Sequence, residues 1–269
     1  MVPSLDRTNA QLSVKGFDLM LRVLSYNIHK GFSLDRRFVL ENIKSAIRET
    51  NADLVFLQEV LGEHKGLAAK IQNWPVSPQL EFLAESIWPH FAYGKNAVYT
   101  EGHHGNAILS RHAFRSFDNI DVSTNRFERR GLLHATLEPL VAGGSPLHLI
   151  CVHLDLLERG RAQQIDRLIH RIRMHVPDEA PLIIAGDFND WREQISVVLE
   201  SALRVEEVHK KINGAHAKSF PSWFPFLQLD RMYIRGLEGQ EAKCLTGPPW
   251  NQLSDHVALF ARLEILPRD

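Results

Sequence analysis

Cysteine is scarce in this sequence, and neither sign of charge is in excess. There are two cysteines among 269 residues, too few for a disulfide framework or a cysteine-based zinc site. One of them, Cys151, lies in the apolar run from Leu147 to Val152 and is interpreted as a buried free thiol. The formal net charge is -1. This argues against tight duplex binding through overall charge, although a local basic groove is compatible with it.

Long apolar runs are also missing. No stretch approaches the roughly 20 apolar residues of a transmembrane helix, and the polar segment 1–18 lacks the apolar core of a signal peptide. We therefore expect a soluble cytoplasmic protein. Residues 1–18 are expected to form a flexible N-terminal tail and residues 19–269 a single domain, because no repeat, low-complexity tract or linker interrupts them. No feature implies a stable protein partner, so a monomer is expected.

What the sequence does contain is a series of short apolar runs separated by helical patterns. Runs rich in Val, Ile, Leu and aromatic residues predict strands. The stripe from Ile165 to Ile172 has the spacing of an amphipathic helix, and two more helices are predicted near residues 38–47 and 80–87. The predicted strands are 21–26, 54–57, 107–109, 132–137, 147–152, 182–185, 229–234 and 257–263. Strands mixed with helices indicate sheets that are covered by helices.

The main chemical signal is the position of polar residues at the ends of apolar runs. One run leads into the segment Gly186 to Asn189, and in extended backbone Asp187 and Asn189 point to the same side. Such a pair can hold a water and a phosphoryl oxygen, but these residue types also favour an ordinary turn. Glu59 closes another run, where a carboxylate needs a partner such as a divalent cation unless it reaches solvent.

Histidines and further acids occupy comparable positions. Asn27 follows the first predicted strand, and His153 ends another. Asp230 lies inside an apolar run, where a buried carboxylate needs a donor such as a histidine N–H. Asp255 and His256 can converge only if the backbone turns there, and together they offer a metal ligand beside a proton donor or acceptor.

Taken in chain order, these residues resemble the motifs of the endonuclease/exonuclease/phosphatase superfamily, which has the deoxyribonuclease I-like fold. The resemblance is to a bacterial-type branch of metal-dependent hydrolases, and it extends from the first predicted strand to the last. The matching segments are Ser-Tyr-Asn27-Ile-His, Gln-Glu59-Val, Gly-Asn106-Ala-Ile-Leu-Ser, Val-His153-Leu, Gly-Asp187-Phe-Asn189-Asp, Leu-Asp230-Arg and Ser-Asp255-His256. Single short motifs often match by chance, whereas an ordered set rarely does.

The resemblance implies an α+β fold, a four-layer α/β/β/α sandwich in which two packed mixed sheets are flanked by helices. It implies hydrolysis of a phosphoester, foremost a phosphodiester, by in-line attack of water with Mg²⁺ or alternatively Mn²⁺ as cofactor. Asn27, Glu59 and Asp255 would hold the metal, since oxygen ligands suit hard cations. The implied catalytic residues are His153, Asp187 (which activates the water), Asn189, Asp230 and His256.

Some residues carry weaker indications. The resemblance implies that Asn106 contacts the substrate phosphate. Arg130 belongs to a basic stretch that is either solvated or a phosphate clamp. Trp191 either stacks on a base, sugar or head group or packs against the rim of the site. The segment 219–226 is either an aromatic substrate lip or a loop folded onto its own side chains. The pair His103-His104 could suggest zinc, but it is interpreted as part of a solvated loop because no cysteine or third histidine accompanies it at a metal-site spacing.

The substrate class stays open at this level. One departure bears on it: His29 stands where several DNA-repair relatives carry an acid, which weakens the analogy to abasic-site endonucleases. Nucleic acid and phospholipid or sugar-phosphate head groups are the expected substrate classes, and small nucleotides also remain open. The alternative is a catalytically silent binding module of the same fold. Such modules usually lose the Asp-x-Asn or the Asp-His pair, and both pairs are present here.

Overall fold

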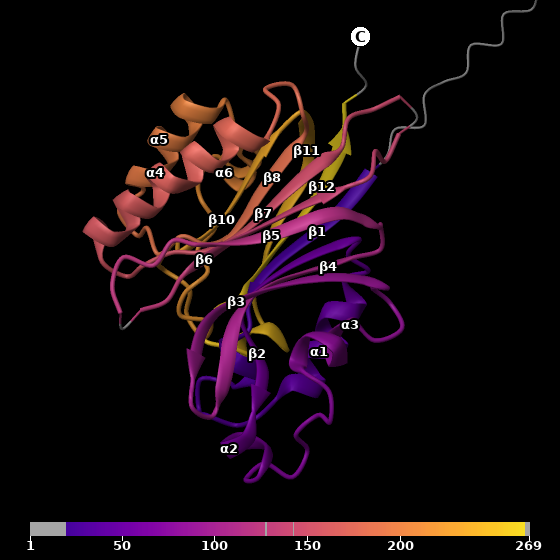
Figure 1. Cartoon of the computed structure of the whole chain (residues 1–269), viewed down its shortest axis with the longest axis vertical. Coiled ribbons are helices and arrows are strands. Elements are labelled where there is room, and N and C mark those ends of the chain that lie inside the picture. The colour runs from indigo at the N-terminus through magenta and orange to yellow at the C-terminus, as the bar shows by residue number, and fades with distance from the viewer. Residues whose placement is uncertain (1–19, 127, 142, 267–269) are drawn as a thin grey trace, which may run out of the picture.

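Two six-stranded sheets form the centre of the protein, and helices cover their outer faces (Figure 1). The computed structural model describes residues 20–126, 128–141 and 143–266. The tail predicted for residues 1–18 lies outside these described residues. The arrangement of helices, two sheets and helices confirms the predicted four-layer sandwich.

The first sheet joins the beginning and the end of the described chain. Its spatial order is β11 (Leu237–Leu245), β12 (Ala258–Ile265), β1 (Met20–Asn27), β2 (Leu54–His64), β4 (Gly102–Ser110) and β3 (His90–Tyr99). β1 and β2 run parallel, and the other neighbours are antiparallel. Asn27 at the end of β1 pairs with Gln58, so that it lies beside Glu59 in the middle of β2.

The second sheet is formed by the middle of the chain. Its order is β5 (Phe114–Asp121), β6 (Gly131–Leu137), β7 (Leu147–His153), β8 (Leu182–Asp187), β10 (Asp230–Arg235) and β9 (Glu206–Glu207). β7 and β8 are parallel and therefore end at the same edge of the sheet. β10 is antiparallel to β8, so it begins where β8 ends.

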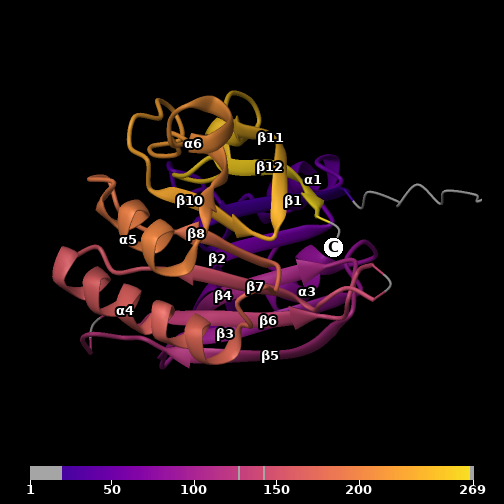
Figure 2. The ribbon, with the colours of Figure 1, turned by 90° about the horizontal axis from the view of Figure 1, so that it is seen from above.

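Apolar side chains fill the space between the sheets and the space under each helical layer. On β2, Phe56 faces the other sheet while Val55 and Leu57 face the helices, because successive side chains of a strand point to opposite faces. α1 (Leu40–Glu49) and α3 (Gln79–Ala84) cover the first sheet, whereas α4 (Glu158–His175) and α5 (Gln194–Leu203) cover the second (Figure 2). Strands buried on both faces explain the continuous apolar runs in the sequence.

The shorter elements lie around these layers. They are the helices α2 (Lys65–Ala68) and α6 (Val208–Asn213) and the 3-10 turns η1 (His29–Gly31) and η2 (Trp250–Gln252). No helix within the described ranges is long and apolar enough to cross a membrane.

Four strands lack the pattern that predicted the others: β3, β5, β9 and β11. Most of their residues are exposed or half-buried, so their sequences contain no sustained apolar run. β2 and β4 differ from the prediction in length. β2 continues past Glu59 to His64, and the segment around His104, expected to be a solvated loop, is part of β4.

Candidate active site

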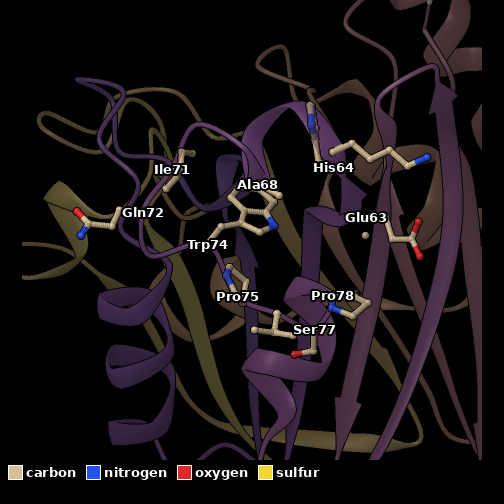
Figure 3. A pocket seen from close by; sticks show the side chains of 12 residues that line it. Glu63, His64, Ala68, Ile71, Gln72, Trp74, Pro75, Ser77 and Pro78 are labelled. Carbon is tan, nitrogen blue, oxygen red and sulfur yellow. The ribbon is translucent and has the colours of Figure 1, made fainter.

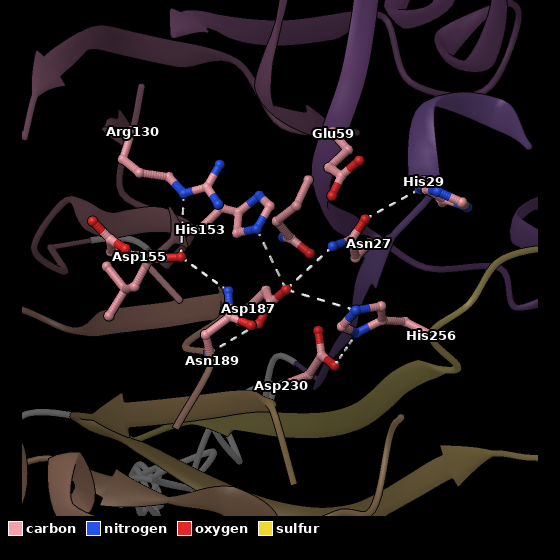
Figure 4. A network of polar contacts seen from close by, with 12 residues as sticks. Asn27, His29, Glu59, Arg130, His153, Asp155, Asp187, Asn189, Asp230 and His256 are labelled. Atoms are coloured by element: carbon pink, nitrogen blue, oxygen red, sulfur yellow. Dashed lines mark hydrogen bonds and ion pairs between the residues drawn. The ribbon is translucent and has the colours of Figure 1, made fainter. Parts of the chain in front are cut away.

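The predicted catalytic side chains meet at the edge where β1, β7 and β8 end (Figure 4). His153 on β7 and Asp230 on β10 are the strand partners of Asp187 on either side of β8. From the first sheet, Asn27 Nδ2 donates a hydrogen bond to Asp187 Oδ2 at 3.2 Å. Asp187 is therefore the point where polar groups of both sheets converge.

His256 lies between two carboxylates. Its Nδ1 is 2.7 Å from Asp230 Oδ2, and its Nε2 is 3.7 Å from Asp187 Oδ2. Burial alone would lower the pKa of His256, but the charges of Asp230, Asp187 and Asp255 outweigh it and raise this pKa to about 10. The imidazole is therefore cationic at neutral pH, and the expectation that a histidine satisfies Asp230 agrees with this geometry.

The Asp187 carboxylate is surrounded by donors but is shielded from water. Burial raises the pKa of Asp187 to about 7, against the opposing effect of the His256 charge. Asp187 Oδ2 faces His153 Nε2 at 3.5 Å, and Asp187 Oδ1 accepts a hydrogen bond from the Asn189 backbone N–H at 3.0 Å. A carboxylate with such a pKa can accept a proton near neutral pH.

His153 has a different charge state from His256. Burial holds the pKa of His153 well below its usual range, and the neighbouring Arg130 and His256 charges add to this effect. The neutral ring carries one N–H, which can donate a hydrogen bond to an oxygen. The two histidines at this edge are thus distinct, one cationic and one neutral.

The backbone turns at Asn189 rather than continuing in extended form. Its φ is 51°, which is left-handed, so the expectation that Asp187 and Asn189 share one face of a strand is wrong. The turn lets the Asn189 N–H cap the Asp187 carboxylate. The side-chain Nδ2 donates to the Leu154 carbonyl at 2.9 Å, which leaves a second N–H on the amide and the oxygen Oδ1.

A bend at residues 254–256 brings Asp255 and His256 to the same site. Ser254 Oγ donates to the Asn27 carbonyl at 2.7 Å and accepts from the His256 N–H at 3.3 Å. This side chain therefore fastens the end of β1 to the loop before β12. The expected turn of the backbone at this point is present.

On the first-sheet side of the site, two carboxylates each lie beside a basic side chain. Glu59 Oε2 lies 3.6 Å from Lys30 Nζ, and Asp255 Oδ1 lies 3.8 Å from His29 Nδ1. Burial acts to raise the pKa of Glu59, but nearby cationic groups, Lys30 foremost, bring it below its ordinary value. Glu59 has a φ of 59° at a register shift of β2, and this bulge directs its side chain to the site.

Among the described side chains, two groups are candidate ligand sets for a divalent cation. Asp187, Asp230 and His256 have potential ligand atoms within 4.8 Å of one another. A protonated imidazole has no lone pair for a metal, so a cation at this group would have to displace the proton that Asp230 and Asp187 favour on His256. Asn27, Glu59 and Asp255 offer amide and carboxylate oxygens only, which is the donor set that Mg²⁺ and Mn²⁺ prefer.

The three predicted substrate-binding residues lie in different surroundings. Asn106 is buried, and its Nδ2 donates to the carbonyls of Gly131 and Cys151. It thereby joins the two sheets, and its contact with a phosphate stays a prediction. Arg130 is largely buried and donates to Glu128 and to the Leu154 carbonyl.

Arg130 lies beside the site rather than on a solvated face. Its charge lowers the pKa of both His153 and His104, which locates the guanidinium near these rings.

Trp191 is exposed on the loop after β8. The Arg161 guanidinium lies 4.8 Å from the centroid of its ring.

Lys30 is a site neighbour that the sequence did not single out, and His104 is one that the sequence analysis assigned to a solvated loop. Burial lowers the pKa of His104 to about 4, with a further contribution from Lys30 and an opposing one from Glu59. Lys30 directly follows the Asn27-Ile28-His29 motif, and this position is the sequence signal that could have identified it as a site neighbour. His104 could not be located, because its position depends on the pairing of β4 with β2.

A separate pocket of about 480 Å³ lies between the end of β2, α2 and the segment 71–78 (Figure 3). Trp74 contributes to its wall and stacks on Phe38, with the ring centroids 4.9 Å apart. None of the predicted catalytic or metal-binding residues lines this pocket. The candidate active site is therefore the polar edge in Figure 4 and not this cavity.

Sequence comparisons cover nearly the whole chain. A sequence model of the Endonuclease/Exonuclease/phosphatase family matches residues 24–256. The uncharacterized protein YbhP of Escherichia coli K12 is 41% identical over 245 residues, which make up 91% of this chain and 96% of YbhP.

Solved structures with the same fold differ in what their names say they act on. TDP2 from D. rerio, complexed with a single-strand DNA product, is 19% identical, with a TM-score of 0.67 over 91% of this chain and 99% of TDP2. The mannosyl-6-phosphatase Bt3783 of Bacteroides thetaiotaomicron is 16% identical, with a TM-score of 0.69 over 90% of this chain and 99% of its own. At these identities the likeness concerns the fold alone.

Proposed function

Because the chain belongs to the endonuclease/exonuclease/phosphatase family, we propose that it is a divalent-metal-dependent hydrolase of phosphoesters, foremost phosphodiesters. Its substrate is a nucleic acid or a lipid or sugar-phosphate head group. Two structures of the same fold, TDP2 complexed with a single-strand DNA product and a mannosyl-6-phosphatase, support both classes.

The observation that carries this proposal is the row of Asp230, His256 and Asp187, with His153 on the other side of Asp187. It provides a cationic group and a neutral N–H donor on either side of a proton acceptor. A reaction that adds negative charge to a phosphate needs this combination.

Each side chain then has a distinct task. Asp187 orients the attacking water and takes its proton, and water displaces the leaving group in line without a covalent enzyme intermediate. His153 and Asn189 donate hydrogen bonds to phosphoryl oxygens. His256, held by Asp230 at 2.7 Å, stabilises the charge that develops on the phosphoryl group.

The oxygen donors of Asn27, Glu59 and Asp255 would hold the metal ion. Mg²⁺, with Mn²⁺ as the alternative, supplies charge neutralisation on the phosphate and the leaving oxygen when bound. The bulge at Glu59 and the bend at Asp255 direct both carboxylates to the edge where Asn27 ends β1.

The test is hydrolysis of bis-p-nitrophenyl phosphate with Mg²⁺ or Mn²⁺, with and without a chelator. We expect chelation to abolish turnover, and Asp187→Ala or His256→Ala to lower it by about 100-fold or more. Absence of hydrolysis with either metal, on this and on a panel of nucleic acid and head-group substrates, would contradict the proposal. It would favour the catalytically silent binding module.

A buried histidine outside the site provides a matched control. His216 Nδ1 lies 3.0 Å from Glu207 Oε2, and its Nε2 lies 3.2 Å from Ser196 Oγ. This Ser-His-Glu row is itself no candidate catalytic site, because Ser196 is buried and also bonded to the Tyr233 hydroxyl. His216→Gln removes the His216–Glu207 pair, which resembles the His256–Asp230 pair but lies outside the site. We therefore expect a lower melting temperature but near wild-type turnover.

A further inference from the structure

Three loops that adjoin predicted catalytic residues also expose large apolar side chains. They follow His153 on β7, follow Asp187 on β8 and precede Asp230 on β10. We call their exposed apolar residues the apolar rim: Leu156, Leu157, Trp191, Trp223, Phe224 and Phe226. Large exposed apolar side chains gathered around a site indicate a binding surface, whereas scattered ones do not.

Buried arginines join the three loops to one another. Arg161 lies under the Trp191 ring and donates to the Leu156 carbonyl. Arg231 donates to the Asp190 carbonyl at 3.0 Å and also to the Gln228 carbonyl. The apolar rim therefore belongs to one connected edge of the second sheet.

The segment 219–228 is a braced loop that exposes Trp223, Phe224 and Phe226, while Phe220 packs against His256 with the ring centroids 5.0 Å apart. Ser219 N donates to the Leu227 carbonyl at 2.9 Å, and Ser222 N donates to the Asp255 carbonyl at 2.7 Å. Trp223 and Phe224 remain 65% and 64% exposed. Since these bonds hold the loop in place, the exposed rings are a stable feature of the site's border, where Trp223 and Phe224 lie side by side with their ring centroids 6.0 Å apart.

We propose that the apolar rim docks on the surface of a phospholipid bilayer. This inference rests on the proposed function, because docking would bring head-group phosphoesters to the candidate active site. Tryptophan and phenylalanine side chains favour the membrane interface, where rings and aliphatic groups leave water without leaving the polar head groups.

The charges on the same loops favour a lipid surface over single-stranded nucleic acid. The exposed Arg159 and Arg192 are balanced by the exposed Glu158 and Glu193, of which Glu158 and Arg159 begin α4 directly after the first loop, and the segment 219–228 contains no charged residue. Nucleic acid binding needs a positively charged track along the phosphates. The exposed leucine pair, with Leu157 68% exposed, also offers no ring on which a base could stack.

The test is co-sedimentation with unilamellar phosphatidylcholine vesicles. We expect wild-type protein to bind, with little change between about 50 and about 200 mM NaCl, because apolar insertion does not depend on counterion release. The double variant Trp223→Ser, Phe224→Ser should bind vesicles at least about tenfold more weakly than the wild type, since two large apolar side chains are lost.

The control variant removes exposed apolar residues that lie elsewhere. Phe117 on β5 and Met174 near the end of α4 are 50% and 64% exposed. Phe117→Ser, Met174→Ser should bind vesicles like the wild type. Equal binding by the rim and control variants, or no vesicle binding by the wild type, would overturn the proposal.

A parallel binding assay with single-stranded nucleic acid decides between a lipid surface and a nucleic acid as the partner. Fluorescence anisotropy with a single-stranded oligothymidylate should show weak binding that Trp223→Ser, Phe224→Ser leaves unchanged. If these substitutions abolish oligonucleotide binding and spare vesicle binding, the apolar rim is a stacking surface and the lipid proposal is wrong.

Vesicle binding is separable from catalysis. The Asp187→Ala protein should sediment with vesicles like the wild type, because Asp187 is buried behind the apolar rim's loops. A protein that binds vesicles but hydrolyses no phosphoester would contradict the proposed function alone. One that hydrolyses phosphoesters but ignores vesicles would contradict the docking surface alone.

Discussion

His256 Nδ1 lies 2.7 Å from Asp230 Oδ2, and this contact joins the loop before β12 to the first residue of β10. Both side chains are buried. Each charge offsets the other's cost of leaving water, so that removal of one leaves its partner uncompensated. We therefore expect Asp230 to act through His256 as a positioning residue.

Asp230→Asn tests this relationship, because it keeps the shape of the side chain and removes its charge. We expect kcat to fall by about 10- to 100-fold. The pKa of His256, raised in part by Asp230, should fall as well. The measurements are turnover of bis-p-nitrophenyl phosphate and an NMR titration of the His256 ring. An unchanged ring titration together with unchanged kcat would show that the pair has no part in the reaction.

Glu59→Gln tests the metal ligands. It removes one carboxylate from the oxygen donors, so we expect the Mg²⁺ concentration for half-maximal turnover to rise about tenfold or more. Glu63→Gln on the same strand is the matched control, because Glu63 is exposed and lines the separate pocket. If both variants need the same Mg²⁺ concentration as the wild type, Glu59 does not hold the metal.

The edge at which the site forms could be predicted from strand ends alone. Asp187, His153 and Asp230 each border an apolar run, and the ends of paired strands meet. Their roles stay predictions. The sequence could not predict the left-handed turn at Asn189 or the bulge at Glu59, because these depend on register and hydrogen bonds between strands.

The exposed strands show the same limit. β5 was missed because it lies at the edge of its sheet and has no fully buried residue, so its side chains are not constrained to be apolar. The proximity of His104 to the site also follows from the pairing of β4 with β2, which no local pattern encodes.

Gly186→Ala tests the close approach of β7 and β8. Gly186 has a φ of 145°, and an added Cβ would overlap the Val152 carbonyl oxygen. We expect the free energy of unfolding to fall by about 3 kcal/mol, because the backbone cannot move without disturbing Asp187. Urea denaturation measures it. Gly143→Ala is the control, since its φ is 74° but nothing lies within 4 Å; an equal loss there would refute steric overlap as the cause.

Two buried histidines on the outer face of the second sheet make stability depend on pH. Arg171 Nε donates to His134 Nδ1 at 3.1 Å, so this nitrogen carries no proton. The other nitrogen, His134 Nε2, lies 3.0 Å from His148 Nδ1 and donates to it. Thr136 Oγ1 faces the same nitrogen of His148 at 3.4 Å. Each ring therefore accepts a hydrogen bond at one of its nitrogens, and a ring with such an unprotonated nitrogen is neutral.

Burial lowers the pKa of His134 to about 3 and that of His148 to about 4, from an ordinary value of 6.5. The unfolded chain therefore binds more protons than the folded one below pH 6.5, so stability is complete above this pH and declines as the pH falls toward 4. We expect a lower urea midpoint at about pH 5 than at about pH 7.5. His134→Gln, His148→Gln should reduce this difference, because neither replacement titrates. A difference that is the same in wild type and variant would assign the acid sensitivity to other groups.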